Sequence, residues 1–312
     1  MGTEFPEELS KYVDIVFDKI TMLIKQRVWG NVSLDRFKRW TSQFKTIEDK
    51  YNAAYLAYNL IFYNKKDFTS LITWSIGEAI KKITLLKNGT ITYKTDTEWK
   101  GLLTNSIQKT LICPLITDSA AASGFMVTRL LRDQGIIPEV NTCVSKEEVF
   151  EKLIRAEYEA VIFVDDMIGS GDQAITSLHE KQNIGGMRTS VIEKLHELRP
   201  DINILIAVAV SPLRSIEKIE STTGVTVIAA EILTERNELL NGSFWSQNEF
   251  GFQQGIDFLK KIKKESNIPY KGYNDSSWVL TFEHGAPDIT SPFYFKEYKE
   301  WTSLVRYRGE DN

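Results

Sequence analysis

The stretch AVIFVDDMIGSGDQ, residues 160–173, decides the fold that this sequence predicts. Its first five residues form an apolar run rich in β-branched side chains, which is typical of a strand buried on both faces of a parallel sheet. Asp165 and Asp166 therefore fall at the carboxyl end of that strand, the edge at which open α/β sheets bind ligands. The glycine-rich turn at residues 169–171 precedes a predicted helix, so it would offer backbone N–H groups and a positive helix end to an anion. The stretch predicts a sugar-phosphate site.

This pattern resembles the signature of the type I phosphoribosyltransferases: four apolar residues, two acidic ones, and a Thr/Ser-Gly loop that holds the 5-phosphate of phosphoribosyl pyrophosphate. The resemblance implies that Asp165 and Asp166 lie beside the ribose hydroxyls and act with Mg²⁺, which makes them the candidate catalytic and metal-binding residues. It also implies a phosphate cradle made of Gly169, Ser170, Gly171, Asp172 and Gln173.

The cradle departs from the family at Asp172 and Gln173, where the family usually has a small or basic residue and then Thr. A carboxylate repels a phosphate unless it points away, so Asp172 predicts a weakened or shifted phosphate site. An ordinary core strand that ends in a solvated acidic turn is the alternative interpretation of the whole stretch.

The surrounding sequence favours the ligand site, because strand-like and helix-like segments alternate up to residue 233. Buried strands are predicted at residues 110–116, 202–210 and 225–233, in addition to the run at 160–164. Helices are predicted at residues 125–134, 145–156, 187–198 and 211–224, and from residue 172 onward. This alternation predicts a parallel, right-handed, doubly wound sheet.

The loop after the first of these strands would face the pyrophosphate in the phosphoribosyltransferase interpretation. Its candidate ligand-binding residues are Asp118, Ser119, Ser123 and Gly124. The basic residue that the family usually carries in this loop is absent. An Asp/Ser cap on an ordinary helix is an equally good interpretation.

Residues 8–87 have helical periodicity and predict a bundle of about four helices, including segments at 51–63 and 67–87. Asn88-Gly89 is a turn signal, and we place a domain boundary between residues 88 and 106. The expected architecture is an all-helical N-terminal domain, residues 1–105, followed by an α/β domain of the type I phosphoribosyltransferase kind, residues 106–312.

The C-terminal tail resembles the closing segment of phosphoribosyltransferase-like proteins from bacterial conflict systems, which include anti-phage and retron-associated ones. A Gly-Tyr pair and a His-x-x-Pro-Asp turn recur in that branch, and Gly272-Tyr273 and residues 284–288 match them here. The resemblance makes His284 a candidate ligand-binding residue. A lone histidine is more often simply packed, so that alternative stays open.

Composition excludes several other classes of protein. A net charge of −4 carries no polyelectrolyte footprint for nucleic acid, and no apolar run reaches transmembrane length. The only cysteines, Cys113 and Cys143, predict two buried thiols in a reducing compartment, and we expect a cytoplasmic protein. No His, Cys and carboxylate spacing suits zinc.

The resemblance implies that the protein is a phosphoribosyltransferase-like effector of a bacterial anti-phage system. It would bind phosphoribosyl pyrophosphate or a nucleotide with Mg²⁺ and transfer or cleave at C1 of the ribose. A catalytically inactive ligand-binding module and a housekeeping nucleobase transferase are the alternatives. We expect a protein partner, such as a reverse transcriptase with its nucleic acid, and no membrane partner. Whether the chain forms a homo-oligomer is left open by the sequence.

Overall fold

The computed structural model describes residues 7–88, 95–117 and 122–308. The chain forms two compact units, Thr69–Leu233 and the combination of Met1–Phe68 with Thr234–Asn312. We call the first the α/β unit and the second the terminal unit. These limits differ from the expected single boundary near residue 105, because the chain's two ends share one core. Among the described helices, none combines the length and apolarity that a membrane span needs.

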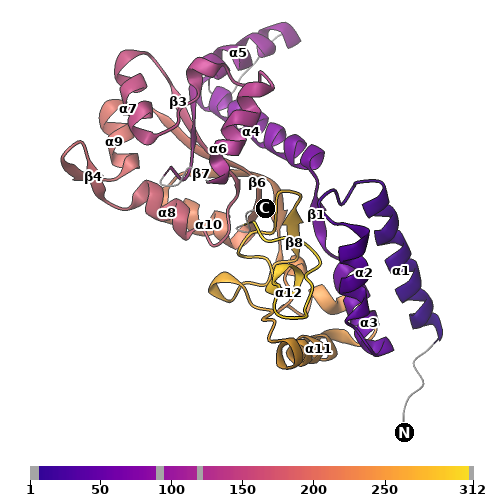
Figure 1. Cartoon of the computed structure of the whole chain (residues 1–312). Helices are drawn as coiled ribbons and strands as arrows, with labels where there is room; N and C mark the ends of the chain where they lie inside the picture. Colours follow the sequence, from indigo (N-terminus) through magenta and orange to yellow (C-terminus); the bar gives the residue numbers. More distant parts are fainter. Residues whose placement is uncertain (1–6, 89–94, 118–121, 309–312) are drawn as a thin grey trace. The chain divides into compact units, whose positions relative to one another are not determined.

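The α/β unit is built on a four-stranded parallel sheet, which confirms the predicted sheet (Figure 1). Its strands are β2 (Thr110–Pro114), β3 (Ala160–Met167), β6 (Asn203–Pro212) and β7 (Thr226–Leu233), and they lie side by side in that order. Every residue of β2 and β3 is buried, as expected for apolar runs covered on both faces.

The chain also adds a short extension beyond β2. Thr142 forms a parallel bridge with Ile112, and the N–H of Cys143 donates to the carbonyl of Ile112 over 2.8 Å. Helix α6 (Ser123–Asp133) leads from β2 to this extension, and α7 (Lys146–Arg155) leads back to β3. The chain therefore leaves β2 toward the extension at one edge of the sheet, and it leaves β3 toward β6 on the opposite side. In a doubly wound sheet this is the switch point, where ligands bind beyond the carboxyl ends of the strands.

Helices cover the sheet by burying alternate strand residues. One continuous core joins the sheet to α7, α8 (Asp172–His179), α9 (Val191–Leu198) and α10 (Leu213–Thr223). The strand residues in this core are every second one, including Cys113, Val161, Phe163, Ile206, Val208 and Val227. Helix α6 contacts β2 and β3, and its buried residues do not belong to this core.

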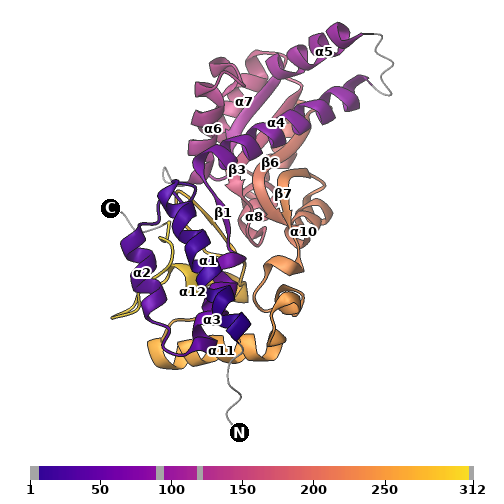
Figure 2. The same ribbon diagram turned by 90° about the vertical axis from the view of Figure 1, so that its right-hand side faces the viewer.

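Two helices precede the sheet, and one of them was not predicted. Helix α4 (Lys65–Asn88) confirms the segment expected at 67–87, whereas α5 (Asp96–Gln108) begins inside the span of residues 88–106 in which the domain boundary was expected. The two lie side by side in both views (Figure 2), joined by a buried hydrogen bond from Thr84 Oγ1 to Ser106 Oγ over 2.7 Å. The signal for α5 was present, because Thr95 caps it by accepting from the N–H of Glu98.

Residues 182–190 also differ from the prediction. The helix predicted from Met187 begins only at Val191, and the preceding residues form an antiparallel hairpin of β4 (Gln182–Ile184) and β5 (Met187–Thr189). Gly185 and Gly186 both have positive φ, +60° and +85°. Two consecutive left-handed residues make the tight turn that joins such strands, and glycine adopts that conformation without strain.

The terminal unit joins the two ends of the chain. Its main elements are α1 (Glu7–Lys25), α2 (Leu34–Ser42), α3 (Ile47–Tyr58), β1 (Ile61–Tyr63), α11 (Gly251–Ser266), β8 (Leu280–Phe282) and α12 (Pro292–Phe295). Strand β1 pairs in parallel with β8. The N-terminal region is therefore not all-helical, and the helix predicted at 51–63 ends at Tyr58. Local periodicity could not show this, because the partner strand lies more than 200 residues further along the chain.

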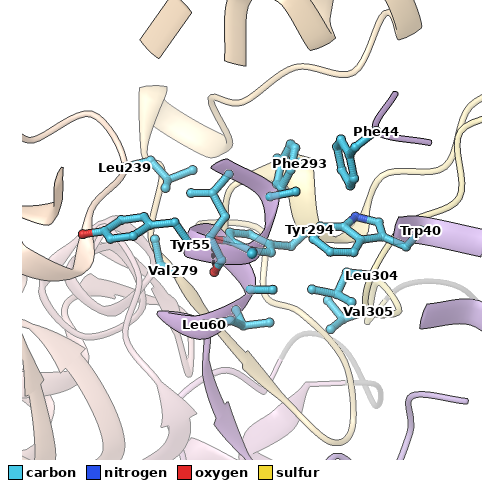
Figure 3. Close-up of a cluster of buried hydrophobic side chains, with 14 of the residues drawn as sticks. Trp40, Phe44, Tyr55, Leu60, Leu239, Val279, Phe293, Tyr294, Leu304 and Val305 are labelled. Carbon is cyan, nitrogen blue, oxygen red and sulfur yellow. Dashed lines mark hydrogen bonds between the residues drawn. The ribbon is translucent and has the colours of Figure 1, made fainter. Parts of the chain in front are cut away.

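Aromatic side chains from both ends fill the core of the terminal unit (Figure 3). The ring of Phe293 from α12 lies 6.1 Å from that of Trp40 and 6.5 Å from that of Phe44, measured between centroids. Buried hydroxyls are satisfied by backbone, as where Tyr294 donates to the carbonyl of Leu56 over 3.1 Å. Tyr51 and Tyr55 of α3 thus belong to this core, whereas Tyr58 at the end of the same helix is exposed.

Candidate functional site

The acidic pair lies within β3 rather than after it. Pro114, the last residue of β2, pairs with Val164, whereas β3 continues to Met167. Asp165 and Asp166 therefore lie past the end of β2, whereas β6 on the other side still pairs with β3 there. This is the switch point of the sheet. The two residues are only 8% and 1% exposed, so the pair is buried and not a solvated turn. Burial of two adjacent carboxylates costs free energy, which is characteristic of a functional site rather than a structural one.

Ser123 and Gly124, at the start of α6, contact the acidic strand. The hydroxyl of Ser123 donates to Oδ1 of Asp165, which also accepts from the N–H of Asp166 over 2.8 Å. A Cβ atom at Gly124 would lie 2.7 Å from the carbonyl oxygen of Val164, so only glycine allows this approach. The structure thus brings Ser123 and Gly124 to the predicted site, where Ser123 orients a carboxylate. Asp118 and Ser119, also predicted there, lie outside the described residues.

The donor set at this point fits Mg²⁺. No group of three or more metal-ligating side chains occurs in the described part of the chain, so these residues form no complete protein cage for a metal. Mg²⁺ does not need one, since it is usually held by one or two carboxylates together with substrate oxygens and water. Asp165 and Asp166 supply carboxylates of that kind.

The glycine-rich turn leads directly into α8. Gly171 has φ +82° and occupies the N-cap of α8, which has no side-chain cap. The turn is held against α10, because the hydroxyl of Ser215 donates to the carbonyl of Gly169 over 2.6 Å. A Cβ atom at Gly171 would come within 3.2 Å of the Ile219 side chain. The result is a fixed turn with a positive helix end, which suits an anion.

Asp172 is the residue from which the sequence predicts a weakened or shifted phosphate site. Its Oδ1 atom forms an ion pair with Nζ of Lys218 on α10, at 2.5 Å. The lysine offsets the negative charge at the start of α8, so the carboxylate is not an isolated charge facing the phosphate turn. Gln173, the other departure from the family pattern, is exposed on α8.

Lys146 is a charged residue of this region that the sequence did not single out. It is only 7% exposed, and its Nζ donates to the carbonyl and hydroxyl of Ser177 over 3.0 and 2.5 Å. The hydroxyl of Ser177 in turn donates to the carbonyl of Leu115, the first residue after β2, over 2.7 Å. A buried cation therefore stabilises the start of the loop predicted to face pyrophosphate. As the first residue of a helix, Lys146 carried no sequence signal.

His284 belongs to the terminal unit. Its ring stacks on Phe282 with centroids 4.9 Å apart, and the ring of Phe68 lies 5.2 Å away. The Nε2 atom of His284 lies 3.4 Å from Nη2 of Arg308. All three neighbours lie in the terminal unit, and the role of His284 in ligand binding stays a prediction.

Comparison with protein families identifies the family of the chain. The model of the family described as PRTase-CE matches residues 37–306, which include most of both units. Comparison with curated proteins and comparison with solved structures gave no match. A match over well over half of the chain shows the family. The buried acidic pair at the switch point and the glycine turn before α8 agree with the family's phosphoribosyltransferase-like character, and the chain therefore belongs to the PRTase-CE family.

Proposed function

We propose that the chain binds phosphoribosyl pyrophosphate, or a related phosphoribosyl nucleotide, beyond the carboxyl ends of β2 and β3. The observation that carries the proposal is the position of Asp165 and Asp166: two buried carboxylates at the switch point, followed by the glycine turn that begins α8. A purely structural strand end would have no need to bury two adjacent charges.

Each part of the site has a role in this proposal. The acidic pair binds the ribose hydroxyls and supplies ligands for Mg²⁺, while Ser123 keeps Asp165 oriented. The backbone N–H groups at the start of α8 bind the 5-phosphate. Lys146 holds the loop that would face pyrophosphate. Bound Mg²⁺ would neutralise charge on the pyrophosphate leaving group.

The proposed reaction is transfer or cleavage at C1 of the ribose. The bond from C1 to pyrophosphate breaks with both electrons leaving on the pyrophosphate oxygen. A nucleophile, either an acceptor or water, forms the new bond to C1 and gives up its proton. The protein contributes mainly position and electrostatic stabilisation.

We also propose that the protein acts as an effector of a bacterial anti-phage system, controlled by a partner such as a reverse transcriptase with its nucleic acid. Support comes from the resemblance of residues 272–288 to conflict-system proteins. An inactive phosphoribosyl-binding module is the second candidate, and the observation that favours it is Asp172 in place of the family's small or basic residue.

Calorimetric titration with phosphoribosyl pyrophosphate and Mg²⁺ tests the binding proposal. The Asp165→Asn, Asp166→Asn variant should lose binding, whereas Asp201→Asn, which removes one exposed carboxylate before the amino end of β6, should keep it. Equal binding by all three proteins would contradict the site. Turnover with acceptor panels then separates the enzyme from the inactive module, because the module would bind without releasing pyrophosphate.

A growth assay tests the effector role. Expression of the chain alone should slow bacterial growth, and the double Asn variant should not. Harmless expression together with ordinary nucleobase salvage activity would instead support a housekeeping transferase.

A further inference from the structure

The terminal unit contains a pocket of about 350 Å³, lined by residues from three stretches of the C-terminal tail, 269–273, 288–296 and residue 307. The charged and aromatic residues of its lining are Lys271, Tyr273, Asp288, Phe295, Lys296 and Tyr307. We propose that this pocket is a second ligand site, which binds a nucleoside monophosphate by stacking its base on Tyr273 and holding its phosphate with lysine. The volume is within the range of about 300 to 1,000 Å³ that is usual for small-molecule sites.

Tyr273 begins a turn whose next two residues have the left-handed backbone conformation. Asn274 and Asp275 have φ of +51° and +58°, and the N–H of Ser276 donates to the carbonyl of Tyr273 over 3.0 Å. This is a tight turn with two left-handed central residues, neither of them glycine. Such conformations cost free energy and concentrate at ligand clamps and other functional sites. The backbone hydrogen bonds of Tyr273, to Ser276 and to Asp288, hold this lining residue in position before any ligand arrives.

A close backbone approach builds the pocket wall. A Cβ atom at Gly272 would lie 2.7 Å from the carbonyl oxygen of Asp288 and 2.9 Å from that of Thr290. The same carbonyl of Asp288 accepts from the N–H of Tyr273 over 3.2 Å. Gly272-Tyr273 and Asp288, which belong to the two motifs of the C-terminal tail, therefore lie against one another and line the pocket together.

The aromatic lining suits a planar base. The rings of Phe295 and Tyr307 stack on one another with centroids 4.8 Å apart and 22° between their planes. Tyr273 is more than half exposed, at 52% of its residue surface. An exposed tyrosine beside a stacked aromatic pair can bind a base at little entropic cost, and stacking of this kind tolerates every base.

The charges distinguish a nucleotide from other planar ligands. Two lysines line the pocket against one carboxylate. Lys271 forms only an exposed pair with Asp275, at 3.4 Å, and exposed pairs of this kind hold a lysine weakly. Lys296 forms no ion pair with any described residue. Two available cations suit a phosphate, and the exposed Asp288 carboxylate can accept from a ribose hydroxyl or a base amino group.

Calorimetric titration of the full chain with AMP and UMP tests the site, and a short single-stranded oligonucleotide shows whether a free nucleotide or a strand is preferred. Tyr273→Ala should weaken binding about tenfold, as expected for loss of a base-stacking ring. Lys296→Glu should weaken it at least as much. The matched controls are Tyr298→Ala, which removes a tyrosine 40% exposed elsewhere in the unit, and Lys264→Glu on α11, which makes the same charge change.

The outcomes separate the two sites. Binding that the two pocket substitutions weaken, and that both controls and the Asp165→Asn, Asp166→Asn variant retain, supports a second site in the terminal unit. Binding lost only in the double Asn variant would overturn it, because the nucleotide would then occupy the α/β unit. Absence of AMP and UMP binding at millimolar concentration, or equal effects of the pocket and control substitutions, would also overturn it.

Discussion

Nζ of Lys218 and Oδ1 of Asp172 lie 2.5 Å apart at the start of α8. The pair joins α10 to the residue that follows the glycine turn. Both side chains are nearly half exposed, so the contact contributes little to folding. Its effect is on the local charge: the carboxylate that would repel a phosphate has a cation beside it.

Removal of that cation should weaken phosphoribosyl binding. With Lys218→Ala, Asp172 becomes an uncompensated charge at the phosphate turn, and we expect about fivefold weaker binding, since an exposed pair is worth up to about 1 kcal/mol. Asp172→Ala should have the opposite effect, because it frees Lys218 for the ligand. Calorimetry measures both. The control is Lys260→Ala, which breaks an exposed pair with Asp257 on α11; an equal effect there would show that the change is not local.

Addition of a methyl group at Gly124 should destabilise the α/β unit. The new Cβ would lie 2.7 Å from a backbone carbonyl that cannot move easily, and overpacking of this kind costs about 1 to 3 kcal/mol. Chemical denaturation measures the change. Gly101→Ala is the matched control, since that helical glycine in α5 has nothing within 4 Å and alanine should stabilise it. Equal stability of the two variants would mean that α6 can shift away from β3.

Neutralisation of the acidic pair should not destabilise the protein. In the Asp165→Asn, Asp166→Asn variant, the amide oxygen at position 165 can still accept from Ser123 and from the backbone, while two buried neighbouring charges are removed. We expect a Tm equal to that of the wild type or higher, measured by calorimetry. A clearly lower Tm would show that the carboxylates stabilise the fold, and would weaken the argument for a functional pair.

The two cysteines should be unreactive in the native state. Burial raises the pKa of the Cys143 thiol to about 12, and burial also raises the pKa of Cys113 well above its ordinary value. Both thiols therefore stay protonated at pH 8, and a disulfide-exchange reagent should label them only after denaturation. Rapid labelling of either cysteine in the folded protein would contradict this.

The same pKa shifts predict how stability depends on pH. In the unfolded chain the thiols lose their protons above about pH 8.5, whereas in the folded chain they keep them to higher pH. The unfolded state then binds fewer protons, so the free energy of unfolding falls as pH rises above about 8.5. Denaturation at pH 7.5 and 9.5 should show the fall, and a Cys113→Ala, Cys143→Ala variant should show less of it.

Truncation of Phe293 should test whether the chain's two ends share one core. This ring is 1% exposed and contacts aromatic rings from α2 and α11. Phe293→Ala should cost about 3 to 5 kcal/mol, as is usual for a buried aromatic side chain. The control is Tyr298→Ala on the surface. If instead Phe293→Ala had little effect, the terminal unit would not depend on this core for its stability.

Much of the α/β unit could be predicted from residue patterns because its signals are local. The apolar run at the start of β3, the serine cap of α7 and the glycine that ends α10 each act within a few residues. The acidic pair followed by a glycine turn was visible for the same reason. The family's motif pointed to the same residues.

The sequence alone therefore determined the parallel sheet and the identity of the candidate ligand residues. It did not reveal that Lys218 pairs with Asp172, that Lys146 is buried beside Ser177, or that β1 pairs with β8. Each of these contacts joins residues at least 31 positions apart. Chain periodicity reports which face of an element is buried, but the partner of that face depends on packing of the whole chain, and so the charge balance of the site and the makeup of the terminal unit came from tertiary structure.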